Sequence, residues 1–124
     1  MNRLFISFFE FFRICKFFDY LIYRDAVRKA DEAHAKTGNR YYVIPNTDGK
    51  LIVVDRKNFR ILKNKHYFSH HVSVNELISG CFYMTPYRHG DGRLSNSSLS
   101  FKLRRYYHWR SSFRHSVQKS RKRG

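Results

Sequence analysis

The feature that most constrains the fold is a pair of short strand-like segments separated by a turn sequence. Residues 40–45 (RYYVIP) and 50–55 (KLIVVD) are rich in β-branched and aromatic side chains, and the intervening residues 46–49 (NTDG) end in Asp-Gly. This pattern predicts a β-hairpin with a four-residue loop. Pro45 lacks an amide hydrogen, which suits an edge position or the entry to a turn. Because an isolated hairpin is marginally stable in water, it must pack on a helix or pair with another strand.

A long helix is expected before the hairpin. In residues 1–23 polar side chains recur every three or four positions and phenylalanines cover much of the remaining surface, which predicts an amphipathic helix with a wide aromatic face. Charged residues interrupt this segment every few positions, so it predicts neither a membrane-spanning helix nor a cleaved signal peptide. The helix is expected to continue through the alanine-rich residues 24–37 and to end at Gly38.

Two further helices are expected after the hairpin. Asp55 is placed to cap a short helix over residues 56–65, with Phe59 on its inner side. Ser73 and Glu76 match a capping box, which predicts a helix from Val74 to about Met84. The apolar side of that helix is formed by Leu77, Ile78, Cys81 and Phe82.

The end of the chain predicts a loop, a basic helix and a tail. Glycines and small polar residues over 87–98 indicate an exposed loop. Ser97 or Ser98 is expected to cap a helix that runs to about Val117, and the polar residues after it are expected to be a mobile tail. The apolar stripe of this helix, interrupted by Arg110, comprises Leu99, Leu103, Tyr106, Phe113 and Val117.

These elements predict a mostly helical α+β fold. A helix–hairpin–helix core over residues 24–84 is flanked by the Phe-rich helix of residues 1–23 and by the basic region of residues 85–124. The two cysteines, Cys15 and Cys81, are too few for a disulfide framework and are expected to be buried free thiols.

The charge of the chain predicts an anionic partner. The net charge is +16, from 25 Lys and Arg against 9 Asp and Glu. A compact domain with this imbalance repels itself unless a polyanion or salt neutralises it. Nucleic acid is the commonest such partner, and an anionic membrane surface is the next.

The region after Tyr87 carries the strongest binding pattern. It holds eleven Lys and Arg, one acidic residue and several aromatic side chains. Guanidinium groups bind phosphates through paired donors, and aromatic faces stack on unpaired bases, so the pattern favours a single-stranded nucleic acid over a duplex. The candidate nucleic-acid-binding residues are Lys102, Arg104, Arg105, Tyr107, Trp109, Arg110, Arg114, Lys119, Arg121, Lys122 and Arg123.

Four alternatives to nucleic-acid binding stay open. The Phe-rich helix suits an interfacial membrane helix of a membrane-associated effector. The same aromatic face could pack on the rest of the protein or on a partner subunit, or it could bind a host protein, which would make the chain a scaffold of unknown oligomeric state. The basic region could also be a solvated tail that keeps the protein soluble, or it could bind an acidic protein.

No residue pattern predicts catalysis, a metal or a cofactor. His66, His70 and His71 have metal-compatible spacing, but no Cys or acidic residue lies nearby, so surface histidines are expected. His89 and Asp91 lie in a glycine-flanked sequence, HGDG, which indicates a turn. The chain is therefore expected not to be an enzyme.

Three stretches of the chain resemble small accessory proteins of microviruses, the single-stranded DNA phages of gut bacteria. They are residues 40–65 (RYYVIPNTDGKLIVVDRKNFRILKNK) and the later CFYMTPYRHGDGRLS and LRRYYHWR, and the likeness covers roughly residues 24–110. The resemblance implies a phage protein in the bacterial host cytoplasm or the virion, where single-stranded DNA is the abundant polyanion. It implies no functional residues.

Overall fold

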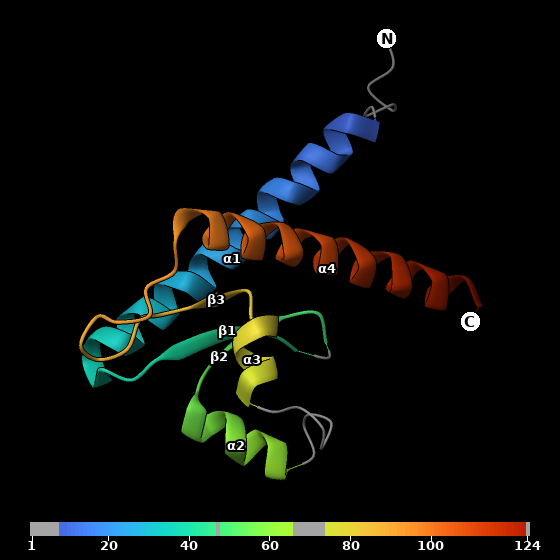
Figure 1. The fold of residues 1–124 in the computed structure, drawn as a ribbon. Helices are drawn as coiled ribbons and strands as arrows, with labels where there is room; N and C mark the ends of the chain where they lie inside the picture. Colours follow the sequence, from blue (N-terminus) through green and yellow to red (C-terminus); the bar gives the residue numbers. More distant parts are fainter. Residues whose placement is uncertain (1–7, 47, 66–73, 124) are drawn as a thin grey trace.

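The computed structural model describes residues 8–46, 48–65 and 74–123, and it describes no side chains for residues 8–12, 74, 75, 77 and 118–123. Within these residues the chain has the predicted α+β fold, with a small antiparallel sheet and a larger helical part (Figure 1). The elements are α1 (Phe8–Thr37), β1 (Tyr41–Pro45), β2 (Leu51–Asp55), α2 (Arg56–Asn64), α3 (Val74–Gly80), β3 (Tyr83–Met84) and α4 (Asn96–Arg123).

The predicted hairpin is confirmed, but its predicted four-residue loop is wrong, because Pro45 pairs with Leu51 and residues 46–50 separate the two strands. A third strand extends the hairpin. β1 and β2 pair antiparallel from Tyr41↔Asp55 to Pro45↔Leu51, and the order of the sheet is β2-β1-β3. The expected helix to Met84 is wrong, because α3 ends at Gly80 and β3 begins at Tyr83, after the irregular residues Cys81 and Phe82. The Phe82 amide donates to the Val43 carbonyl (2.8 Å), so Phe82 satisfies its backbone amide by bonding to β1 just before β3 begins.

Helices cover both faces of the sheet, which explains why the strand sequences are continuously apolar. On one face Tyr42, Ile44 and Val54 pack with Phe59 of α2 and with Cys81. On the other face Val43 packs with two alanines of α1, Ala26 and Ala30. Figure 1 shows α2 and α3 on one side of the sheet and α1 and α4 on the other.

The long first helix is confirmed as one continuous element. α1 runs through the expected boundary at residue 23 and ends at Thr37, and Gly38 adopts φ +78° with its amide bonded to the His34 carbonyl (2.7 Å). This is the left-handed helix stop that glycine favours. Figure 1 shows the N-terminal half of α1 extending beyond the sheet. Cys15 in this half is only partly buried, and it is a free thiol like Cys81.

The last helix is longer than predicted at both ends. Ser95 caps it by accepting a hydrogen bond from the Ser98 amide (3.2 Å), so neither Ser97 nor Ser98 is the cap. The backbone stays helical to Arg123, where a mobile tail after Val117 was expected. α4 packs on α1 through Tyr106 and Tyr23, whose ring centroids are 5.1 Å apart.

The short second helix begins as predicted. The Asp55 carboxylate accepts a hydrogen bond from the Asn58 amide (2.7 Å), and Phe59 is buried. The predicted Ser73 cap of α3 lies outside the described residues, as do His66, His70 and His71.

Candidate nucleic-acid interface

Lys102, one of the predicted phosphate-binding residues, belongs to the core. It is 7% exposed, and its ammonium donates to the carbonyls of Ile78 (3.1 Å) and Cys81 (2.9 Å). Ile78 lies in the last turn of α3, where unpaired carbonyls favour a cation. Lys102 therefore closes the end of α3 and is withdrawn from the interface. Burial also raises the pKa of the Cys81 thiol, although the Lys102 ammonium lies nearby, so Cys81 has no thiolate for chemistry at neutral pH.

Arg110 and Arg114 bind a buried carboxylate of α1. Arg110 Nε lies 3.2 Å from Asp19 Oδ1, and Arg114 Nη2 lies 2.9 Å from the same oxygen and 3.1 Å from Oδ2. The Asp19 side chain is 5% exposed. Arg110 also donates to the Gly49 carbonyl in the hairpin turn. This Asp19 clamp (Asp19, Arg110 and Arg114) joins α4 to α1 and to the hairpin, so both guanidinium groups are used by the fold.

The clamp explains why an arginine interrupts the apolar stripe of α4. Tyr106, one helical turn before Arg110, is fully buried, and its hydroxyl donates to the backbone carbonyl of Asp19 (2.6 Å). Burial raises the pKa of Tyr106, which keeps this hydroxyl protonated as a donor. The same face of α4 therefore presents first a tyrosine and then two arginines to one turn of α1.

The two predicted stacking residues are half-buried. Tyr107 and Trp109 both pack against the cluster formed by Tyr23, Phe82 and Tyr106. The ring centroids of Trp109 and Phe82 are 5.5 Å apart, and Nζ of Lys16 in α1 lies 5.1 Å from the Tyr107 ring centroid. Each ring therefore has one side in the core and only part of its surface free for a ligand.

Arg104 and Arg105, the remaining predicted residues of α4 whose side chains the structure describes, line a surface hollow. We call this hollow of about 580 Å³ the aromatic groove. Arg104 is exposed and has no partner among the described residues, whereas Arg105 donates to the Ser79 carbonyl (2.6 Å). The principal lining residues of the aromatic groove are Phe82, Phe101, Arg104, Arg105, His108 and Trp109.

The aromatic groove combines exposed cations with aromatic surface. Phe101 is 56% exposed, and the Arg105 guanidinium lies 5.9 Å from its ring centroid. Rings that accept bases beside cations that accept phosphates are the usual components of single-strand binding sites. The side chains of Lys119, Arg121, Lys122 and Arg123 lie outside the described residues, so only their helical backbone is placed.

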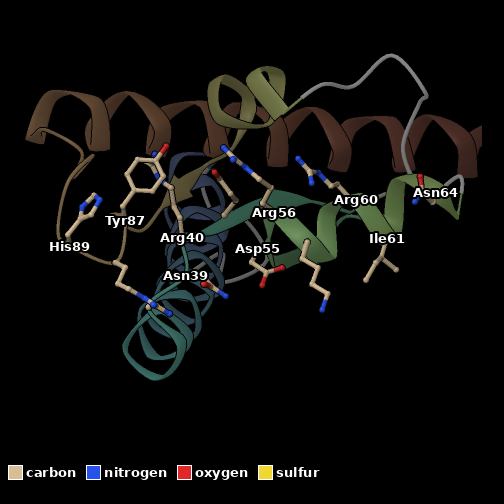
Figure 2. A pocket seen from close by; sticks show the side chains of 13 residues that line it. Asn39, Arg40, Asp55, Arg56, Arg60, Ile61, Asn64, Tyr87 and His89 are labelled. Carbon is tan, nitrogen blue, oxygen red and sulfur yellow. The ribbon is translucent and has the colours of Figure 1, made fainter.

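A second cationic surface lies between α2 and the loop after β3. We call this hollow of about 600 Å³ the basic groove, and Figure 2 shows the side chains that line it. Its cations come from three separate segments of the chain, and they are Arg40, Arg56, Lys57, Arg60 and Arg88. Asp55 contributes a carboxylate, which is already bonded to the Asn58 amide (2.7 Å).

The basic groove is missing from the predicted site because its residues are distant in the sequence. One part of the groove could have been found from the sequence, namely the unbalanced positive charge of residues 56–65. Residues 56–65 carry five basic side chains and no acidic one, although acidic residues at helical spacing normally balance an exposed helix face.

The outer face of α1 changes character along the helix. Towards its C-terminal end the exposed face is charged and paired, since Arg28 lies 2.7 Å from Asp25 and 2.9 Å from Glu32. Towards the N-terminus the same face is apolar, with exposed fractions from 39% to 60%. We call this the α1 apolar face, and its residues are Ile14, Phe17, Phe18, Leu21 and Ile22. Asp19 lies in the same part of α1 but is buried, because its carboxylate binds the two arginines of the Asp19 clamp.

The described residues offer no cluster for a metal, and their His89–Asp91 pair is exposed. No group of three His, Cys, Asp or Glu side chains could hold a metal among them. His89 Nδ1 lies 3.1 Å from Asp91 Oδ2, but both side chains are more than two-thirds exposed. Gly90 between them has φ +84°, and its amide donates to the Tyr87 carbonyl (2.8 Å), which fits the predicted turn.

No helix among the described residues has the length and apolar character needed to cross a membrane.

In comparisons with known proteins, no family model, no curated protein and no solved structure matches the chain.

Proposed function

We propose that this protein binds single-stranded nucleic acid without catalysing a reaction. The observation that carries the proposal is the aromatic groove, where Arg104, Arg105 and His108 surround the exposed parts of Trp109 and Phe101. Cations neutralise backbone phosphates, while aromatic faces accept unpaired bases of any sequence. The net charge of +16 supports rapid association with any such polyanion.

The proposal includes a phage setting. Its support is the resemblance of residues 24–110 to microviral accessory proteins, for which single-stranded DNA is the abundant polyanion of the host cytoplasm and the virion. The interface proposed here is narrower than the predicted one, because Lys102, Arg110 and Arg114 serve the fold.

The interface is tested by titrating the protein with oligothymidylate. We expect quenching of Trp109 fluorescence at about 50 mM salt and a steep loss of affinity as salt rises. The double substitution Arg104→Gln/Arg105→Gln is expected to weaken binding about tenfold and to reduce the slope of log K against log salt by about 1.4, from two lost phosphate contacts.

The matched control removes the same charge from α1. Arg24→Gln/Lys36→Gln replaces two exposed cations that have no partner among the described residues. It is expected to weaken binding less than threefold and to leave the salt slope nearly unchanged. Equal losses from both pairs, or no binding by the wild type, would refute the proposed interface.

A second candidate function is association with an anionic membrane surface. The α1 apolar face favours it, because this face is exposed and Arg13, Lys16 and Arg24 are exposed on the same part of the helix. An interfacial helix needs this combination of apolar side chains and nearby cations.

Membrane association is tested by sedimentation with vesicles of phosphatidylserine and phosphatidylcholine. Phe17→Gln/Leu21→Gln is expected to lower the partition coefficient at least tenfold, because burial of each side chain contributes about 1.5–3 kcal/mol. Ile61→Gln, at an α2 position exposed to a similar degree (41%, against 39% for Leu21), is the control and is expected to sediment like the wild type. If both variants sediment like the wild type, the basic surfaces alone hold the protein on vesicles.

A further inference from the structure

The cations of the basic groove divide into a fixed set and a free set. Arg40 is fixed, since it donates to the carbonyls of Thr85 and Gly92 (both 2.8 Å) and lies 4.3 Å from the Tyr87 ring centroid. Arg88 donates to the carbonyl of Thr37 (3.1 Å) at the end of α1. These bonds hold the loop after β3 in place, so one wall of the groove is already rigid without a ligand.

The free set comes from α2. The side chains of Arg56, Lys57 and Arg60 are exposed, and none has a hydrogen bond or ion pair within the described part of the chain. Arg60 is four residues after Arg56 and three after Lys57, spacings at which like charges on a helix repel each other.

The contrast with α1 shows that this repulsion is not a general property of the chain. There, Lys29 and Arg28 both bind Asp25, and Arg28 also binds Glu32. α2 has no acidic residue in its first turn beyond the Asp55 cap. Cations that repel each other across a hollow become stabilising only when an anion lies between them.

The shape of the groove indicates an extended anion. In Figure 2 the labelled side chains follow one another across the view from His89 and Tyr87, through Arg40 and Arg56, to Arg60. Arg56 and Arg60 are about 6 Å apart along the helix axis, which is comparable to the separation of neighbouring phosphates in an extended strand. A single phosphate would reach only part of this row.

From these contacts we infer that the basic groove binds consecutive backbone phosphates of a nucleic-acid strand. Arg56, Lys57 and Arg60 bind the phosphates, and the wall built on Arg40 positions the strand against them. The inference rests on the proposed function and adds to it a second contact site, separate from the aromatic groove. A lipid surface fits this hollow poorly, because Ile61 is the one exposed aliphatic side chain among its described lining residues.

The test measures fluorescence anisotropy of a labelled oligothymidylate with the full chain across a salt series. The groove variant is Arg56→Gln/Lys57→Gln/Arg60→Gln. The control, Arg24→Gln/Lys36→Gln/Lys50→Gln, removes three exposed cations that have no side-chain partner among the described residues.

We expect the groove variant to bind at least tenfold more weakly, with a salt slope reduced by about 2 for three lost phosphate contacts. The control is expected to lose less than threefold. Equal losses in the two variants would mean that net charge alone matters and would overturn the inference.

Two further measurements separate this inference from the proposed interface on α4. If Arg104→Gln/Arg105→Gln has no effect while the groove variant still weakens binding tenfold, the α4 interface fails and the groove stands. Inorganic tripolyphosphate, titrated by calorimetry, tests the ligand. Binding of tripolyphosphate through the groove without binding of oligothymidylate would overturn the assignment to a strand, and so would vesicle binding that depends on Arg56, Lys57 and Arg60.

Discussion

Replacing Asp19 with asparagine is expected to lower the free energy of unfolding by about 3 kcal/mol. The substitution keeps the shape of the side chain but removes the charge that Arg110 and Arg114 share. The side chains of these arginines are 24% and 32% exposed, so they would be left as partly buried charges with no carboxylate. Removing one partner of a buried ion pair typically costs about 3–5 kcal/mol, and the partial exposure of the arginines places the expected value at the low end.

Urea denaturation monitored by circular dichroism measures this loss of unfolding free energy directly. In a thermal melt, a chain of this size should lose roughly 10 °C in Tm for such a change. The control is Asp25→Asn in the same helix, where Arg28 and Lys29 hold the pKa of the carboxyl below its usual range. Its ion pairs are exposed, so the denaturation midpoint should hardly change.

A double substitution tests the clamp as a unit. Once Arg114 is replaced by glutamine, the loss caused by Asp19→Asn should be smaller than in the wild type, because one of the two stranded charges is gone. Additive losses, or an Asp19→Asn variant as stable as the wild type, would contradict the assigned role of the clamp.

Replacing Gly49 with alanine is expected to lower the free energy of unfolding by about 3 kcal/mol. Gly49 has φ +83°, a conformation that costs a residue with a Cβ roughly 1–2 kcal/mol. A Cβ there would lie 2.7 Å from both Cδ1 and Cζ of Phe113, so the ring would have to move. Overpacking of this kind adds about 1–3 kcal/mol. The same residue accepts a hydrogen bond from Arg110, which ties the turn to α4.

Two other glycines separate the backbone cost from the steric cost. Gly90 has φ +84° but no atom within 4 Å of an added Cβ, so Gly90→Ala should show the backbone cost alone. Gly80 has neither a positive φ nor a neighbour within 4 Å, and Gly80→Ala should leave the protein at least as stable. Thermal melts of the three variants give the comparison, and a Gly49→Ala loss no larger than that of Gly90→Ala would refute the clash with Phe113.

The parts of the fold that local chemistry dictates are the parts that the sequence predicts correctly. The Asp-Gly turn, the Asp55 cap and the Gly38 stop each depend on residues within one turn of one another, and all three are confirmed. β3 depends instead on β1, about 40 positions earlier. Cys81 and Phe82 also fit helical spacing, so their sequence alone favours extending α3 over pairing with Val43.

The length of α4 shows a different limit. The polar residues after Val117 have no apolar pattern, which was interpreted as the end of the helix. Lys and Arg nevertheless have high helix propensity, and the helix continues to Arg123. The absence of an apolar stripe therefore does not mark the end of the helical backbone.

The density of basic residues predicted the basic helix. It could not distinguish basic residues that bond within the fold from those that are free to bind a ligand. The partner of Arg110 and Arg114 lies more than 90 positions earlier, and the carbonyls bonded by Lys102 lie more than 20 positions earlier. Conversely, the basic groove gathers Arg40, Arg56 and Arg88 from segments that no local pattern connects.

The continuity of α1 has a mechanical consequence. No glycine or proline interrupts Phe8–Thr37, so the helix has no built-in hinge between its apolar face and the part that packs on the sheet. About 16 Å of helix lies between Phe8 and Asp19, where the clamp fixes it to α4. Whatever holds the N-terminal half of α1 thereby sets both the distance and the orientation at which the rest of the molecule is presented. The helix therefore acts as a rigid spacer and not as a flexible linker.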